Sequence, residues 1–138
     1  MTVVLDTNVL VSGLITADHP PGRIVDLIRA GVVRLAADDR ILAEYEEVLG
    51  RLFFRRYFTV EEKDRVMAFI RTDSLRCVCV KRFSGLPDPS DSPFAETALA
   101  AGVPLVTGNL KHFPRQACGG IQALTPAQFL EGFHRGSA

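Results

Sequence analysis

The sequence has few cysteines, no excess of charge of either sign and no long hydrophobic run. Sixteen basic residues balance sixteen acidic ones among 138, so no overall field attracts nucleic acid or membranes, and a nucleic-acid role would need a local basic patch. No apolar run approaches the roughly 18 residues that span a bilayer, and the amino terminus lacks a signal-peptide pattern. We therefore expect a cytoplasmic protein.

The three cysteines are Cys77, Cys79 and Cys118. Their odd number and the lack of a CxxC pair predict reduced thiols. Cys77 and Cys79 alternate along one predicted strand, but no His or Cys pair lies elsewhere at ligand spacing, which argues against a zinc site. With 47% hydrophobic and 23% charged residues, the chain is predicted to form one domain over residues 1–138 with a core of its own.

Apolar strands alternate with amphipathic helices along the chain. This order predicts an α/β fold of three layers, in which helices flank a mostly parallel sheet of four to five strands. Predicted strands cover residues 3–5, 32–37, 76–80, 103–107 and 121–124. Predicted helices cover residues 23–30, 38–53, 93–101 and the segments that begin at 59 and 125. Ligands of such sheets gather beyond the carboxyl ends of the strands.

Asp6 lies where the first predicted strand ends. Three apolar residues run into Asp6-Thr7-Asn8, after which the apolar run resumes. Because an isolated carboxylate is costly to bury, Asp6 either caps the following segment or functions in a site at the end of the strand.

Glu44 is a candidate partner of Asp6. It lies at the rim of the apolar stripe of the 38–53 helix, whereas Glu46 lies at the opposite rim and Glu47 points outward. A solvated helix face is the alternative interpretation for each of these residues.

Asp91 is a second candidate, at the entry of the 93–101 helix. An Asp at this place often caps a helix, but Ser92 could cap instead and leave Asp91 available. Asp88 lies nearby in the same loop, whereas Glu96 is expected on the outward, solvent-exposed face of the helix.

A second polar break follows the 103–107 strand. Thr107-Gly108-Asn109 fits a tight turn on structural grounds alone, but two parallel strands of one sheet would place this turn beside Asp6. Clustered carboxylates repel one another unless a cation lies between them, and oxygen ligands of this kind suit Mg²⁺ or Mn²⁺. Such ions activate water for attack on a phosphate.

The order of these features resembles the PIN domain family, the ribonuclease fold of many bacterial toxins. The matching pieces are VVLDTNVLVSGL, ADDRILAEYEEVL, DPSDSPFAETALAAGV, PLVTGNLKHFP and ALTPAQFL. They span nearly the full chain and are most similar to the VapC-like toxins of toxin–antitoxin pairs.

The resemblance implies a Mg²⁺- or Mn²⁺-dependent endoribonuclease. Asp6, Glu44 and Asp91 would bind the metal and act in catalysis. The supporting residues would be Asn8, Thr107, Asn109 and Asp88. Candidate RNA-binding residues are Arg51, Arg55, Arg56, Lys111 and His112. The resemblance further implies an RNA substrate, a small antitoxin protein as partner, and a homodimer.

The sequence departs from the family pattern in the turn after the fourth strand. Many members carry a fourth acid there, where Asn109 or His112 stands in this chain. A catalytically weak or inactive module that binds RNA or an antitoxin is therefore the first alternative function. A phosphatase or phospho-acceptor domain is the second, but the former would need an acid in place of Asn8.

The RLFFRRYF stretch over residues 51–58 mixes arginines with aromatics, as single-strand binding requires. A helix end with core aromatics, or a partner-binding surface, explains the same pattern.

Overall fold

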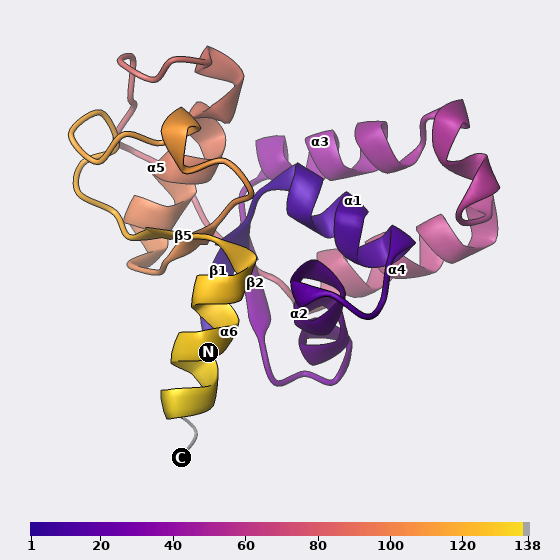
Figure 1. The fold of residues 1–138 in the computed structure, drawn as a ribbon. Coiled ribbons are helices and arrows are strands. Elements are labelled where there is room, and N and C mark those ends of the chain that lie inside the picture. The colour runs from indigo at the N-terminus through magenta and orange to yellow at the C-terminus, as the bar shows by residue number, and fades with distance from the viewer. Residues whose placement is uncertain (137–138) are drawn as a thin grey trace.

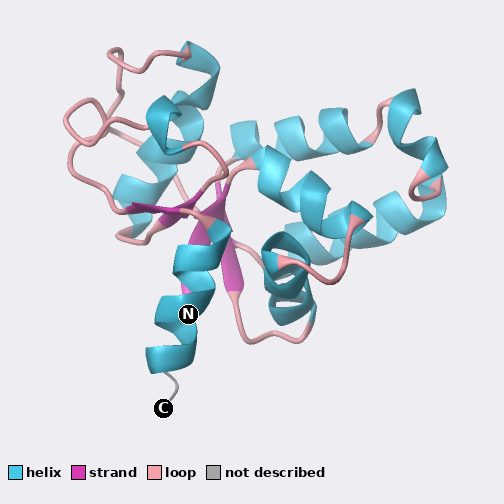
Figure 2. Cartoon of the chain, viewed as in Figure 1, coloured by secondary structure: helices cyan, strands magenta, loops and turns pink. Residues whose placement is uncertain are grey.

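A parallel sheet lies at the centre of the protein. The computed structural model describes residues 1–136. Its strands are β1 (Thr2–Leu5), β2 (Arg34–Ala37), β3 (Leu75–Arg76), β4 (Leu105–Val106) and β5 (Ala123–Leu124). They lie in the order β3-β2-β1-β4-β5, and every pairing is parallel. The predicted α/β fold is confirmed, with β1 in the middle of the sheet (Figure 2).

Helices cover both faces of this sheet. They are α1 (Thr7–Ile15), α2 (Pro20–Arg29), α3 (Asp39–Leu49), α4 (Val60–Asp73), α5 (Ser92–Ala101) and α6 (Pro126–Gly136), with short 3-10 helices η1 (Leu52–Arg56), η2 (Pro89–Asp91) and η3 (Leu110–His112). The first four lie on one side of the sheet, whereas α5 lies on the other side and packs on β1, β2 and β4 (Figure 1). Helix α6 packs on α2 and β5.

Three helices differ from the prediction, and one of them is α2, which begins at Pro20 instead of residue 23. Helix α1 was not predicted, because its residues are apolar almost all round and carry no amphipathic stripe. Helix α3 begins as predicted, with the Asp38 carboxylate accepting a hydrogen bond from the Ile41 amide at 3.0 Å. It ends at Leu49 instead of residue 53, and the chain continues through η1. The capping box predicted at Thr59 and Glu62 is present.

The predicted strand over 76–80 is wrong beyond its first residue. Beta-strand β3 covers Leu75–Arg76, and its last bond to β2 runs from the Cys77 amide to the Ala37 carbonyl, at 2.9 Å. Strand β2 ends at Ala37 and the chain turns into α3, so the following residues have no neighbouring strand to pair with. Strand β1 begins one residue earlier than predicted, at Thr2, whereas β2, β4 and β5 are shorter than predicted and lie within the predicted ranges.

Glu96 was predicted to be exposed, and this prediction is wrong. Its side chain is only 2% exposed and binds Arg40 at 2.8 Å and Arg82 at 3.3 Å. It also accepts the Phe83 amide at 2.8 Å. The helical period correctly places Glu96 away from the sheet, but the 77–83 segment folds over that face of α5. Glu96 thus fastens this segment to α3 and α5.

Within residues 1–136, no helix is long and apolar enough to cross a membrane. Cys77, Cys79 and Cys118 are free thiols, as predicted.

We predict that Glu96→Ala destabilises the fold by about 2–3 kcal/mol, because it leaves the Phe83 amide and two guanidinium groups without their buried carboxylate. Urea denaturation at pH 7.5 measures this change. The matched control is Glu61→Ala, an exposed acid of α4, which should change stability by less than about 0.5 kcal/mol. Equal losses in both variants would contradict the anchoring role of Glu96.

Candidate metal-binding site

Asp6 follows β1 and lies at the topological switch point of the sheet, between β1 and β4. From β1 the chain continues to β2 on one side, while β4 lies on the other, and ligand crevices of open α/β sheets form at such switch points. The register pairs Leu5 with Val106. The Asp6 amide donates to the Val106 carbonyl at 2.9 Å, and the Thr107 hydroxyl donates to the Asp6 carboxylate at 2.8 Å.

This arrangement bears on the two roles weighed for Asp6. The residue occupies the N-cap position of α1, yet among the described residues its carboxylate accepts no capping hydrogen bond. The Asn109 amide donates to the Thr107 hydroxyl oxygen at 3.1 Å, which leaves the hydroxyl proton directed at Asp6. The two polar breaks predicted to lie side by side therefore do so.

Glu44 is held at the same end of the sheet. The Thr7 hydroxyl donates to the Glu44 carboxylate, so the residue after Asp6 orients the second acid. The neighbouring Tyr45 is fully buried, and its hydroxyl donates to the carbonyl of Leu5. These contacts fix α3 against the end of β1, and Glu44 is only partly exposed.

Asp91 lies at the N-terminus of α5, but within residues 1–136 its carboxylate makes no capping hydrogen bond. Ser92 donates its hydroxyl to the Phe83 carbonyl at 3.3 Å, so it is not engaged in capping either. The Asp91 carboxylate faces His112, with Oδ2 and Nδ1 3.1 Å apart. Asp91 is thus available for other ligands.

One cavity of about 500 Å³ brings the predicted acids together. The predicted residues that line it are Asp6, Asn8, Glu44, Arg51, Asp88, Asp91, Asn109 and His112. The sequence analysis missed Thr7, Glu47, Val48, Ser90 and Gly108 among the lining residues. Two signals were available for them: Thr7 lies within the same DTN motif, and positions 44, 47, 48 and 51 share one face of a helix.

The other predicted residues lie outside the cavity lining. Thr107 is fully buried, and its hydroxyl donates a hydrogen bond to Asp6, which lines the cavity. Arg55 donates to the Leu49 carbonyl at the end of α3 and lies over the Phe58 ring. Arg56 lies over Phe53, and the Lys111 amide donates to the Asn109 side chain at 3.2 Å.

Burial and neighbouring acids raise the pKa of Asp91 in the cavity. Burial is the largest cause for Asp91, followed by the charges of Asp6 and Asp88, and its pKa rises to about 6 despite the opposing charge of His112. Burial also raises the pKa of Asp6, and the Thr107 hydroxyl lowers it. Ser90 binds the Asp88 carboxylate through its amide and hydroxyl, which lowers the pKa of Asp88.

A divalent metal ion fits this set of side chains. The pKa of Asp91 is raised first by burial and then by the charges of Asp6 and Asp88, and a cation would favour its charged form and relieve the repulsion. Within residues 1–136, no three His, Cys, Asp or Glu side chains are already arranged to hold a metal ion. Mg²⁺ is commonly bound through one or two carboxylates and keeps several waters. The carboxylate oxygens of the cavity therefore suit Mg²⁺ or Mn²⁺, held partly through water.

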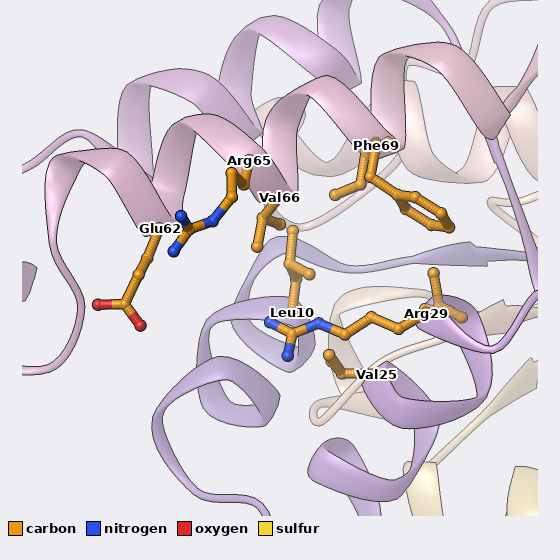
Figure 3. A pocket seen from close by; sticks show the side chains of 9 residues that line it. Leu10, Val25, Arg29, Glu62, Arg65, Val66 and Phe69 are labelled. Carbon is orange, nitrogen blue, oxygen red and sulfur yellow. The ribbon is translucent and has the colours of Figure 1, made fainter.

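A second cavity, of about 330 Å³, has a different character. It lies between α4 and the pair α1 and α2 (Figure 3). Its apolar residues are Leu10, Val25, Ile28, Val66, Phe69 and Ile70. Arg29, Arg65 and Glu62 stand at its mouth, and the charges of both arginines help the Thr59 amide and hydroxyl to lower the pKa of Glu62. The apolar lining and the two arginines suit a ligand that combines an apolar surface with an acidic group.

We predict that Asp91→Asn stabilises the metal-free protein by about 1–2 kcal/mol at pH 7.5. The folded pKa of Asp91 lies above its ordinary value, so its contribution to stability is largest below pH 4 and is lost as the pH rises through about 6. The gain should therefore vanish near pH 4. Urea denaturation with EDTA at both pH values measures it.

The control is Asp26→Asn, an exposed acid of α2, which should have little effect at either pH. Millimolar Mg²⁺ should raise the melting temperature of the unsubstituted chain at pH 7.5, since a ligand stabilises the state that binds it. A gain that is equal at pH 4 and 7.5 would contradict the repulsion inferred at Asp91.

The sequence matches the family model of the PIN domain over residues 2–111. No protein of curated function matches it. Similar folds occur in structures of VapBC2 from Rickettsia felis bound to a promoter DNA fragment (17% identity, TM-score 0.58, covering 91% of this chain and 98% of that chain) and VapBC-1 from nontypeable Haemophilus influenzae (19%, 0.60, 92% and 99%). Another is FitAcB from Neisseria gonorrhoeae (16%, 0.57, 92% and 99%).

At these identities the solved structures establish the fold alone. The family match is of another kind, because it covers most of the sequence and includes Asp6, Glu44 and Asp91. The chain belongs to the PIN domain family.

Proposed function

We propose that this chain is a Mg²⁺- or Mn²⁺-dependent endoribonuclease that hydrolyses phosphodiester bonds of single-stranded RNA. The observation that carries the proposal is the convergence of Asp6, Glu44 and Asp91, from three separate segments, on one cavity at the switch point of the sheet. Membership of the PIN domain family supports a nuclease and favours it over the phosphatase interpretation.

Each group of the cavity has a distinct part in this proposal. Asp6, Glu44 and Asp91 hold the metal ion, while Thr107 and Thr7 fix the directions of the first two carboxylates. When bound, the ion activates water and stabilises the charge that develops on the phosphate. Arg51 and His112 line the same cavity and offer donors to phosphate oxygens.

The second candidate function is a catalytically weak or inactive module that binds RNA or an antitoxin. The turn where the family resemblance implies a fourth acid carries Asn109 and His112, and both line the cavity. They supply a neutral and a basic side chain, so the cavity has less charge with which to bind a second metal ion.

We also propose that the chain is the toxin of a toxin–antitoxin pair and acts in the cytoplasm. Its structural neighbours are toxin–antitoxin complexes, and its free thiols suit a reducing compartment. The apolar cavity between α1, α2 and α4 is our candidate site for the small antitoxin, which would present apolar side chains to Val66 and Phe69 and an acidic group to Arg29 and Arg65. The homodimer stays a prediction.

Cleavage of a fluorescent single-stranded RNA tests the nuclease proposal. The chain should cut it with Mn²⁺ and not with EDTA. Asp6→Asn should lower the rate about 100-fold or more, since loss of even an indirect metal contact costs 10- to 100-fold. The control Glu61→Gln removes the same charge from an exposed position on α4 and should cut normally. Tight RNA binding without cleavage, at any metal concentration, would favour the inactive module.

Partner capture tests the antitoxin surface. An Asp6→Asn chain should capture a small protein in a stoichiometric complex from its host cells. Adding Phe69→Glu should prevent capture, because it places a carboxylate on the apolar surface. The control Arg115→Glu changes an exposed residue outside this cavity and should leave capture intact. A Phe69→Glu chain that still binds the partner would refute the proposed surface.

A further inference from the structure

The arm formed by α3, η1 and α4 extends away from the sheet (Figure 1). Its tip contains the RLFFRRYF stretch, whose aromatic rings divide into two groups. Phe58 is buried, with 7% of its surface exposed, and Phe54 stacks on it with ring centroids 5.8 Å apart. Phe53 and Tyr57 point outward instead, with exposed fractions of 59% and 46%. Core packing thus explains only half of these rings.

The exposed rings carry a cationic neighbour. The guanidinium of Arg56 lies 4.9 Å from the centroid of the Phe53 ring, and the Tyr57 ring lies 6.1 Å from the same ring. We call Phe53, Arg56 and Tyr57 the aromatic tip. Residues 51–60 contain three arginines and no acidic residue, so this positive charge is local in a chain whose net charge is zero. Exposed aromatic rings beside arginines suit the bases and phosphates of a single strand.

The aromatic tip continues from the acidic cavity. Glu44, Glu47 and Val48 line the cavity from one face of α3, and Arg51 lines it just beyond the end of this helix, so the lining extends away from the sheet. Arg51 directly precedes η1 and lies two residues from Phe53. Their Cα atoms are therefore at most about 7 Å apart. A strand that leaves the cavity beside Arg51 meets the aromatic tip next.

We propose that the aromatic tip is a base-stacking platform for single-stranded RNA, which it holds beside the cleavage site by stacking on Phe53 and Tyr57 and by pairing Arg56 with the phosphates. The proposal rests on the proposed nuclease function and goes beyond it, because it assigns RNA contacts to side chains outside the cavity. Charge favours RNA over an apolar protein segment without acids, since Arg56 lies in the tip, Arg55 lies beside it, and residues 51–60 contain no acid.

Binding of a labelled single-stranded oligoribonucleotide to the full chain, with Asp6→Asn to prevent cleavage, tests the platform. Phe53→Ala and Tyr57→Ala should each weaken binding about 5- to 100-fold, as expected for loss of one stacked base. Val60→Ala, at an exposed apolar residue of the same arm, should bind normally. Melting temperatures should agree among all variants because the substituted side chains are exposed.

A fluorescence measurement tests stacking itself. The chain contains no tryptophan, so Phe53→Trp introduces a single indole, and single-stranded RNA should quench its emission. A matched Val32→Trp places the indole at an exposed position before β2, at the opposite end of the sheet, and should not be quenched. Double-stranded RNA should quench neither, because its bases are already stacked on one another.

The outcomes separate the two proposals. Metal-dependent cleavage together with unchanged RNA binding by Phe53→Ala and Tyr57→Ala would overturn the platform and leave the nuclease standing. Loss of protein capture by these variants, with RNA binding unchanged, would make the tip a protein interface and likewise overturn it. Absence of both cleavage and RNA binding in the unsubstituted chain would refute the proposed function and the platform with it.

Discussion

The hydrogen bond from Thr107 to Asp6 joins residues 101 positions apart in the chain, and the site depends on it. It can form only because β1 and β4 are parallel neighbours with Leu5 opposite Val106. Parallel strands bring their carboxyl ends to the same edge, so two short polar breaks become one site. The amide of Asp6 and the amide of Thr107 bond to β4 and β5 in turn, which makes the site continuous with the sheet.

Charge repulsion is the cost of this arrangement. The carboxylates of Asp6, Glu44 and Asp91 face one cavity, and the side-chain groups that bind or face them directly are hydroxyl groups and one imidazole. Thr107 and Thr7 each bind one acid, and His112 faces the third. The pKa of Asp91 stays raised, first because of burial and then because of the charges of Asp6 and Asp88, so this compensation is incomplete. A divalent cation would complete it, so the same feature that destabilises the metal-free fold favours metal binding.

The zero net charge conceals an uneven distribution. Acids gather in the cavity, whereas the three arginines of residues 51–60 lie just beyond the end of α3, in and beside η1. In the proposed function an RNA strand would use both regions, because a metal ion would make the cavity attractive to phosphate and the tip would bind the rest of the strand. The Glu96 network has a separate role: it anchors the 77–83 segment that leads into the loop bearing Asp88 and Asp91.

Local pattern determined the sheet and most helices, and it identified Asp6, Glu44 and Asp91 from their positions at strand ends and helix rims. It also determined the capping box of α4, since that motif involves only neighbouring residues. Tertiary structure decided what depends on distant neighbours. The predicted strand over 76–80 has no neighbouring strand to pair with beyond Ala37. Glu96 is buried by the 77–83 segment, which lies outside the helical pattern that predicted its exposure. The division of the 51–58 aromatics into core and surface was decided in the same way, by packing between α3 and α4.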